Sequence, residues 1–206
     1  MKTDPETYQW VWEGYPQKYG QAVIFKNKVR VEEFDTPDDA IFYYGADWGY
    51  GPDPTCLLRC FVKDRILYLD HACYGYGFEI DDLPSHFGQV PGARSWRIRG
   101  DSHRPDTISY LSRHGFDVIP AVKGPDSVKD GIEFLKNFDA IILHPRLPAG
   151  VIDDFERYRW KEDKITGEIL PVPVDKHNHA PDALRYATEP IRDSDMTIFE
   201  ALAGGR

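Results

Sequence analysis

The stretch IFYYGADWGYGPDPTCLLRCFVKDRILYLDHA, residues 41–72, decides the fold of this chain. It contains three apolar runs, at residues 41–47, 55–62 and 66–72, joined by the turn-forming segments WGYGPDP and KDR. Short runs rich in aromatic and β-branched residues, separated by such turns, are typical of neighbouring strands. We therefore predict an antiparallel meander of three strands.

Beyond residue 72 the pattern alternates between short strands and helices. Strands are predicted at residues 96–101, 116–122 and 139–144, and helices at 77–90, 105–115, 124–138, 148–160 and 178–191. A turn at residues 165–169 predicts a hairpin, and residues 21–34 predict another short one. This alternation is typical of an α/β domain with a mixed β-sheet flanked by helices. We expect the sheet to have about five strands.

Length and composition describe an ordinary globular domain. The chain has 206 residues, of which 41% are apolar and 29% charged, enough for one continuous core. It lacks a run of about 18 apolar residues, so no membrane span is predicted.

Three cysteines without close CxxC spacing argue against a disulfide framework or a zinc site, and indicate buried residues in a reducing cytoplasm. The net charge of −9 counts mildly against nucleic-acid binding, although a carboxylate site for divalent cations is itself acidic.

Two of the predicted strands end in an aspartate that leads into a turn. Asp47 ends YYGAD, Asp101 ends IRGD, and Asp182 lies near the start of the last predicted helix. In open α/β sheets ligands bind at the carboxyl ends of strands. Sites made of oxygen ligands suit Mg²⁺ or Mn²⁺, and two such ions activate water and stabilise the leaving oxygen of a phosphodiester. Aspartate is also a common turn residue, so spacing alone leaves both interpretations open.

Four segments resemble the nuclease domain of phage terminase large subunits, a family with an RNase H-like fold. They are YYGADWGYGPDPT (43–55), RGDSHRPDTISYLSRHGF (99–116), PAVKGPDSVKDGIEFLK (120–136) and, most specifically, DKHNHAPDALRYA (175–187). The likeness extends from about residue 41 to residue 187. It implies an RNase H-like mixed sheet. It also implies a metal-dependent endodeoxyribonuclease that cleaves concatemeric double-stranded DNA during genome packaging by two-metal phosphodiester hydrolysis.

The resemblance assigns roles to five residues of this sequence. It implies that Asp47, Asp101 and Asp182 are catalytic residues and ligands for Mg²⁺ or Mn²⁺, with two ions expected. His179 lies three positions before Asp182, on the same helix face, and beside the metal site in the family pattern. Lys123 is a candidate to reach the scissile phosphate or to occupy the space of a second metal. A solvated loop lysine is the other interpretation of Lys123.

Several other polar residues compete for a place in the site. Glu79 is a candidate fourth carboxylate, because some RNase H relatives have one after the meander. We interpret Asp53, Asp106 and Asp175 as turn or cap residues, and His177 as a surface residue.

Basic residues interleaved with an aromatic residue suggest contact with the DNA backbone. The predicted contact set is Arg104, Arg157, Arg159, Trp160 and Lys161. A polar hairpin with scattered charges is also typical of a solvated loop. The sequence contains no zinc-finger motif or recognition helix, so we expect cleavage with little sequence preference.

The resemblance divides the chain into three segments. Residues 1–40 are predicted to be a lead-in or linker from an ATPase half, residues 41–190 the nuclease domain, and residues 191–206 a loose C-terminal tail. No GxxxxGK[ST] motif occurs, so translocation would need a separate terminase ATPase domain. A small terminase subunit and a portal protein are further implied partners, in the host bacterial cytoplasm.

Two alternatives to this function remain open from the sequence. One is another RNase H-like nuclease, either a junction resolvase or an RNase H. The other is a catalytically inactive domain that docks DNA or the portal.

Overall fold

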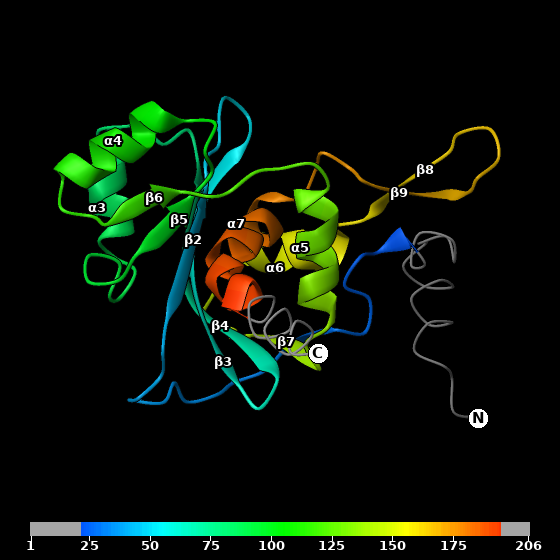
Figure 1. The fold of residues 1–206 in the computed structure, drawn as a ribbon, viewed down its shortest axis with the longest axis horizontal. Coiled ribbons are helices and arrows are strands. Elements are labelled where there is room, and N and C mark those ends of the chain that lie inside the picture. The colour runs from blue at the N-terminus through cyan, green and yellow to red at the C-terminus, as the bar shows by residue number, and fades with distance from the viewer. Residues whose placement is uncertain (1–21, 195–206) are drawn as a thin grey trace, which may run out of the picture.

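The computed structural model describes residues 22–194, which build a seven-stranded mixed sheet with helices on both faces (Figure 1). The strand order is β1-β7-β4-β3-β2-β5-β6. The strands are β1 (Val29–Val31), β2 (Tyr43–Asp47), β3 (Pro54–Lys63), β4 (Ile66–Tyr76), β5 (Ile98–Gly100), β6 (Val118–Pro120) and β7 (Ala140–Leu143). The predicted meander is confirmed, because β3 pairs antiparallel with both β2 and β4. The remaining pairs in this sheet are parallel.

Helices cover the two faces of the sheet unequally. They are α3 (Leu83–Phe87), α4 (Pro105–Arg113), α5 (Ser127–Lys136), α6 (Ala149–Arg157) and α7 (His179–Ala187). Helices α5, α6 and α7 lie together on one side of β2 in Figure 1, and α3 and α4 lie on the other side, beside β5 and β6. Within residues 22–194, no helix is long and apolar enough to cross a membrane.

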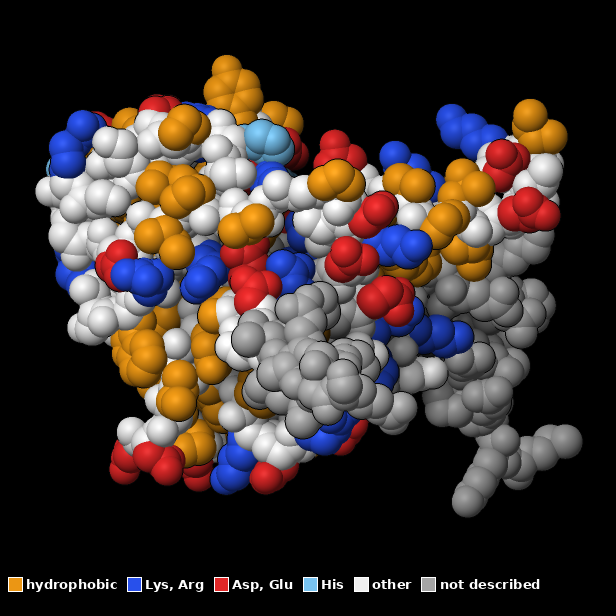
Figure 2. Space-filling model, viewed as in Figure 1, with side chains coloured by type: hydrophobic (Ala, Val, Ile, Leu, Met, Phe, Trp, Pro, Cys, Tyr) orange, Lys and Arg blue, Asp and Glu red, His pale blue; other side chains and the backbone are white. Residues whose placement is uncertain are grey.

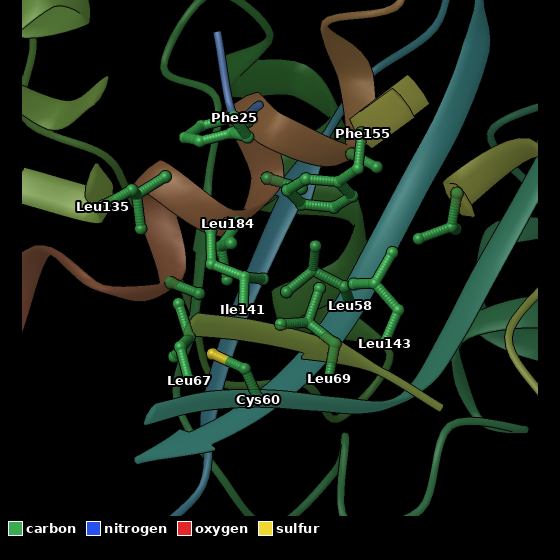
Figure 3. Close-up of a cluster of buried hydrophobic side chains, with 14 of the residues drawn as sticks. Phe25, Leu58, Cys60, Leu67, Leu69, Leu135, Ile141, Leu143, Phe155 and Leu184 are labelled. Atoms are coloured by element: carbon green, nitrogen blue, oxygen red, sulfur yellow. The ribbon is translucent and has the colours of Figure 1, made fainter. Parts of the chain in front are cut away.

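Each face of the sheet has its own hydrophobic core, because successive side chains of a strand point to opposite faces. Leu58 packs in the cluster under α5, α6 and α7, where Figure 3 shows it among Leu143, Phe155 and other apolar side chains. The neighbouring Leu57 belongs to the other cluster, with Phe87 of α3. Cys56 and Cys60 of β3 are buried in the first cluster, and all three cysteines are free: Cys56, Cys60 and Cys73.

Three local predictions are wrong. Residues 21–34 do not form a hairpin: β1 pairs with β7 instead, while Phe25 is buried against the rings of Phe155 and Tyr158. Burial of that ring outweighs the local tendency to fold back. The sheet therefore has seven strands rather than about five. The helix predicted at residues 77–90 is reduced to α3, because Pro84 fits only in the first turn of a helix.

The predicted hairpin around residues 165–169 is confirmed. Strands β8 (Trp160–Glu162) and β9 (Ile169–Pro173) form a separate two-stranded sheet that projects from the body of the molecule in Figure 1. Of the predicted lead-in, residues 1–21 lie outside the described residues, whereas β1 is part of the central sheet. Most of the predicted tail, residues 195–206, also lies outside them.

Helix α7 lies against β2 at Gly45, where there is no room for a side chain. A Cβ atom at Gly45 would lie 1.8 Å from the carbonyl oxygen of Ala183 and 2.6 Å from the amide nitrogen of Ala187. Both neighbours are backbone atoms, so neither can rotate away. Glycine at this position therefore allows α7 to approach the end of β2, which carries Asp47.

We predict that Gly45→Ala lowers the free energy of unfolding by about 1–3 kcal/mol, the usual cost of overpacking a dense contact. Urea denaturation measures this difference. Gly124→Ala is the matched control, because a Cβ atom at Gly124 would meet no atom within 4 Å. An equal stability of the two variants would contradict the close approach of α7 and β2.

Candidate active site at the ends of β2 and β5

The site begins where two neighbouring parallel strands end. Asp47 is the last residue of β2, and Asp101 follows β5 directly. The amide of Asp101 donates a hydrogen bond to the carbonyl of Ala46 (2.9 Å), and the indole of Trp48 donates one to the carbonyl of Asp101 (2.7 Å). The two aspartates therefore leave the sheet side by side.

Helix α7 supplies the third acid and a histidine. His179 opens the helix, and its Nδ1 lies 2.8 Å from Oδ2 of Asp47 in a hydrogen bond. Asp182 is in the first turn, and the guanidinium of Arg185 donates to its Oδ1 (2.9 Å). The close contact of the helix at Gly45 places both polar residues beside the end of β2.

Lys123 reaches the site from the loop that follows β6. Its ammonium group lies 2.5 Å from Oδ1 of Asp101 and 2.8 Å from Nδ1 of His103. The backbone amide of His103 also donates to Oδ1 of Asp101 (3.0 Å). The Lys123 side chain is 29% exposed, so its ammonium group is partly shielded from solvent and lies among these polar side chains.

Electrostatic effects show that the three acids share one region. Burial raises the pKa of the Asp47 carboxyl to about 6; the hydrogen bond with His179 opposes this shift, while the charges of Asp182 and Asp101 add to it. The phenol of Tyr186 is affected by the same three acids: burial raises its pKa first, and Asp182, Asp47 and Asp101 raise it further. The carboxylates are therefore near enough to repel one another.

Neighbouring cations compensate this repulsion. Although burial disfavours its charged form, the hydrogen bond from Lys123 lowers the pKa of Asp101 below its ordinary value. Burial similarly opposes the charged form of His179, but the hydrogen bond to Asp47 raises its pKa. Asp182 has Arg185 as its partner. Each of the three acids is thus paired with a different basic side chain.

The donor set fits a hard divalent cation in its chemistry, because it offers several carboxylate oxygens whose mutual repulsion a cation would relieve. Asp47, Asp101 and Asp182 are the acids predicted from the sequence to be candidate ligands for such a cation. Among the described residues, however, no group of three or more His, Cys, Asp or Glu side chains is gathered closely enough to bind one. The assignment of Asp47, Asp101 and Asp182 as metal ligands therefore stays a prediction.

The competing acids lie elsewhere or have other partners. Glu79 is exposed between β4 and α3. Asp53 is also exposed, with Oδ1 3.9 Å from Nε2 of His179. Asp106 pairs with Arg104 at the start of α4, in agreement with a cap or turn role.

Two other residues complete this comparison. Asp175 accepts only a long contact, 3.5 Å, from the amide of Asn178. His177, interpreted as a surface residue, is partly exposed: its side chain is 21% exposed and lies 3.4 Å from carboxylates of both Asp153 and Asp154.

The predicted DNA-contact residues lie mostly where α6 runs into the hairpin, and several already have partners. Arg157 pairs with Asp153 (2.6 Å), and Trp160 packs in part against the hydrophobic core. Lys161 is exposed, whereas Arg159 is half-buried. On the described part of the face in Figure 2, Lys and Arg side chains are interspersed with Asp and Glu rather than gathered in one patch.

Sequence reasoning missed two supporting residues. Asp154 of α6 is buried, and its Oδ2 accepts hydrogen bonds from the amide of Ala180 and from the hydroxyl of Tyr74, both at 3.1 Å. It thereby fixes the first turn of α7, and nothing in its local sequence indicates this contact. Arg185 was detectable, because a basic residue three positions after Asp182 faces it on a helix.

A family model and two sequence relatives all match this chain to terminase proteins. The family model described as terminase RNase H-like domain matches residues 47–189. The large terminase subunit of Bacillus phage SPP1 is 33% identical over 189 residues, which cover 82% of this chain and 42% of that protein. The PBSX phage terminase large subunit of Bacillus subtilis is 25% identical over 158 residues, 76% of this chain and 36% of that protein. The chain thus spans about two-fifths of the length of these relatives.

Solved structures agree with the sequence relatives. The crystal structure of the large terminase nuclease domain from bacteriophage SPP1, with bound Mn, superposes with a TM-score of 0.71 at 31% identity, covering 80% of this chain and 97% of that one. The nuclease domain of the P22 large terminase has a TM-score of 0.63 at 16% identity, covering 82% and 92%. This second likeness shows that the fold is shared.

The environment of Asp47 predicts a pH-dependent stability. Because its folded pKa of about 6 is above the ordinary 3.8, the protein without metal loses stability as pH rises between these values. Asp47→Asn removes this ionisation, so we expect it to increase the free energy of unfolding at pH 7.5 by on the order of 1–3 kcal/mol. The gain should shrink below pH 4.

Urea denaturation in EDTA at several pH values checks this expectation. Asp64→Asn is the control, because Asp64 is exposed in the turn between β3 and β4. A less stable Asp47→Asn at pH 7.5 would mean that the hydrogen bond to His179 outweighs the cost of burying the charge.

Proposed function

Because this chain belongs to the terminase RNase H-like domain family and is a large-subunit nuclease domain, we propose that it is an endodeoxyribonuclease that cleaves concatemeric double-stranded DNA during phage genome packaging. The observation that supports the proposal is that three acids from separate parts of the chain each pair with a basic side chain near the ends of β2 and β5. Asp47 ends β2, Asp101 follows β5 and Asp182 lies in α7; the charges of Asp182 and Asp101 add to the rise that burial causes in the pKa of Asp47. Repelling carboxylates are costly unless a cation is their partner.

Asp47, Asp101 and Asp182 are the proposed metal ligands, with Mg²⁺ or Mn²⁺ as the cations and two ions as the expected number. The bound Mn of the SPP1 nuclease domain supports this choice. Bound divalent cations supply an activated water and neutralise the charge that develops on the phosphate. The oxygen-only set of acids agrees with the preference of these ions for hard ligands.

The surrounding residues orient the acids and the substrate. His179 holds one oxygen of Asp47, which leaves the other oxygen for a ligand. Lys123 lies against Asp101, where its ammonium group would be placed to contact a phosphate oxygen of a bound substrate. A positive group aimed at developing charge lowers the barrier of phosphodiester hydrolysis.

The proposed substrate and partners rest on family membership. Arg104, Arg157, Arg159, Trp160 and Lys161 remain the proposed contacts to the DNA backbone, without base readout. A terminase ATPase domain, a small terminase subunit and a portal protein are the proposed partners in the host bacterial cytoplasm. The two-fifths coverage of the curated relatives agrees with a separate ATPase half.

We predict that Asp47→Asn, Asp101→Asn and Asp182→Asn each reduce Mn²⁺-dependent cleavage by about two orders of magnitude or more, because each removes a charged ligand of the metal. Nicking and linearisation of a supercoiled plasmid measure the rate. Asp64→Asn should cleave like the wild type. Wild-type activity in Asp47→Asn would contradict the assignment of Asp47 as a metal ligand.

Metal binding has a separate readout in thermal stability. We predict that Mn²⁺ raises the melting temperature of the wild type and fails to raise that of Asp47→Asn, because a ligand that binds only the folded state stabilises it. An inactive protein with no thermal response to saturating Mn²⁺ would favour the docking-domain alternative. Faster cleavage of a four-way junction or an RNA–DNA hybrid than of duplex DNA would favour a resolvase or an RNase H.

A further inference from the structure

Glu189 is a buried carboxylate that the proposed chemistry leaves without a role. It lies just after α7, and only 4% of the residue is exposed. Its Oε1 accepts a hydrogen bond from the backbone amide of Val122 (3.1 Å), and its Oε2 lies 3.3 Å from Nε of Arg99. Among buried side-chain nitrogen and oxygen atoms of residues 22–194, Oε2 is the one without a hydrogen-bond partner.

A carboxylate in this position is costly. Burial raises the pKa of Glu189, and the charge of Arg99 and the amide of Val122 oppose that shift. Apolar residues of similar volume usually replace buried ion pairs without loss of stability. Stability alone therefore does not account for an acid here, and its contacts indicate what it does.

Both contacts of Glu189 adjoin the candidate active site. Val122 immediately precedes Lys123, and Arg99 is two positions before Asp101. The carboxylate thus joins the end of α7 to the strand that carries one acid and to the loop that carries the lysine.

The loop has few other restraints. Residues 121–124 belong to no helix or strand, and Val122 is 69% exposed. Upstream of Lys123, the amide of Ala121 donates to the carbonyl of Gly100 (2.7 Å), and the next amide is the one that Glu189 accepts. Downstream, the carbonyl of Gly124 accepts a hydrogen bond from the amide of Ser127 (3.2 Å), and a Cβ atom at Gly124 would meet no atom within 4 Å. The path of the backbone into Lys123 therefore depends on this carboxylate.

We propose that Glu189 is a positioning residue that holds the 121–124 loop through the Val122 amide, and so keeps the Lys123 ammonium group against Asp101. The proposal rests on the proposed function, because cleavage rate is one of its readouts. Glu189 does not touch the reacting atoms; it acts through Lys123.

The first test compares two substitutions of similar volume. Glu189→Gln keeps an oxygen that accepts the Val122 amide, whereas Glu189→Met does not. We expect hydrogen–deuterium exchange of a peptide spanning residues 121–124 to be faster in Glu189→Met and close to wild type in Glu189→Gln. Equal exchange in Glu189→Met and the wild type would overturn the proposal without reference to activity.

The second test is a double-mutant cycle on single-turnover cleavage of plasmid DNA with Mn²⁺. We expect Glu189→Met and Lys123→Ala each to slow cleavage about ten-fold or more, as small displacements of a positioning group do, with little change in KM. Because both act on one group, the double variant should be no slower than Lys123→Ala. Glu189→Gln should restore most of the rate, and Glu133→Ala, an exposed glutamate of α5, is the control.

The outcomes separate the two proposals. Additive losses in the double variant, or a slow Glu189→Met beside a fully active Lys123→Ala, would overturn the role of Glu189 while leaving the nuclease assignment intact. A wild type that cleaves no DNA, with the exchange difference still present, would overturn the nuclease assignment and leave the structural link from Glu189 to the loop.

Discussion

The missing side chain at Gly45 sets the distance between α7 and β2, and the geometry of the candidate site depends on that distance. The helix backbone occupies the space that any other residue would fill. As a result His179, at the first turn of the helix, reaches Asp47 at the end of the strand. Asp154 holds the same turn through the amide of Ala180. Close packing thus fixes polar groups that come from distant parts of the sequence.

The charges of the site are balanced in pairs. Asp47 has His179, Asp101 has Lys123, and Asp182 has Arg185. This arrangement explains how three acids share one region of an already acidic protein. It also explains why the carboxylates are not gathered around one point: each is drawn toward its own basic partner. A cation would have to compete with these basic residues for the carboxylates. The charge of the site is therefore set by the basic residues and the acids together.

The features predicted from the sequence are those that depend on neighbouring residues in the chain. Strand periodicity located β2, β3 and β4, and the rule that ligands gather at strand ends selected Asp47 and Asp101. Asp182 and His179 were predicted from the resemblance to the terminase family, because their position depends on how α7 packs. The pairing of β1, and the contacts of Asp154 and Glu189, join residues that are far apart in the chain. No local pattern encodes such contacts, and they became visible only in the folded structure.

The pairing of β1 with β7 has a consequence for how the chain folds. Val29 lies beside Ile141, and Lys28 donates to the carbonyl of Phe138, 110 positions later. During synthesis, β1 can therefore pair with β7 only after most of the domain has left the ribosome. Contacts between such distant residues slow folding and leave apolar strands exposed meanwhile. Phe25, which is buried against Phe155 and Tyr158 in the folded protein, is among the apolar residues left exposed until then.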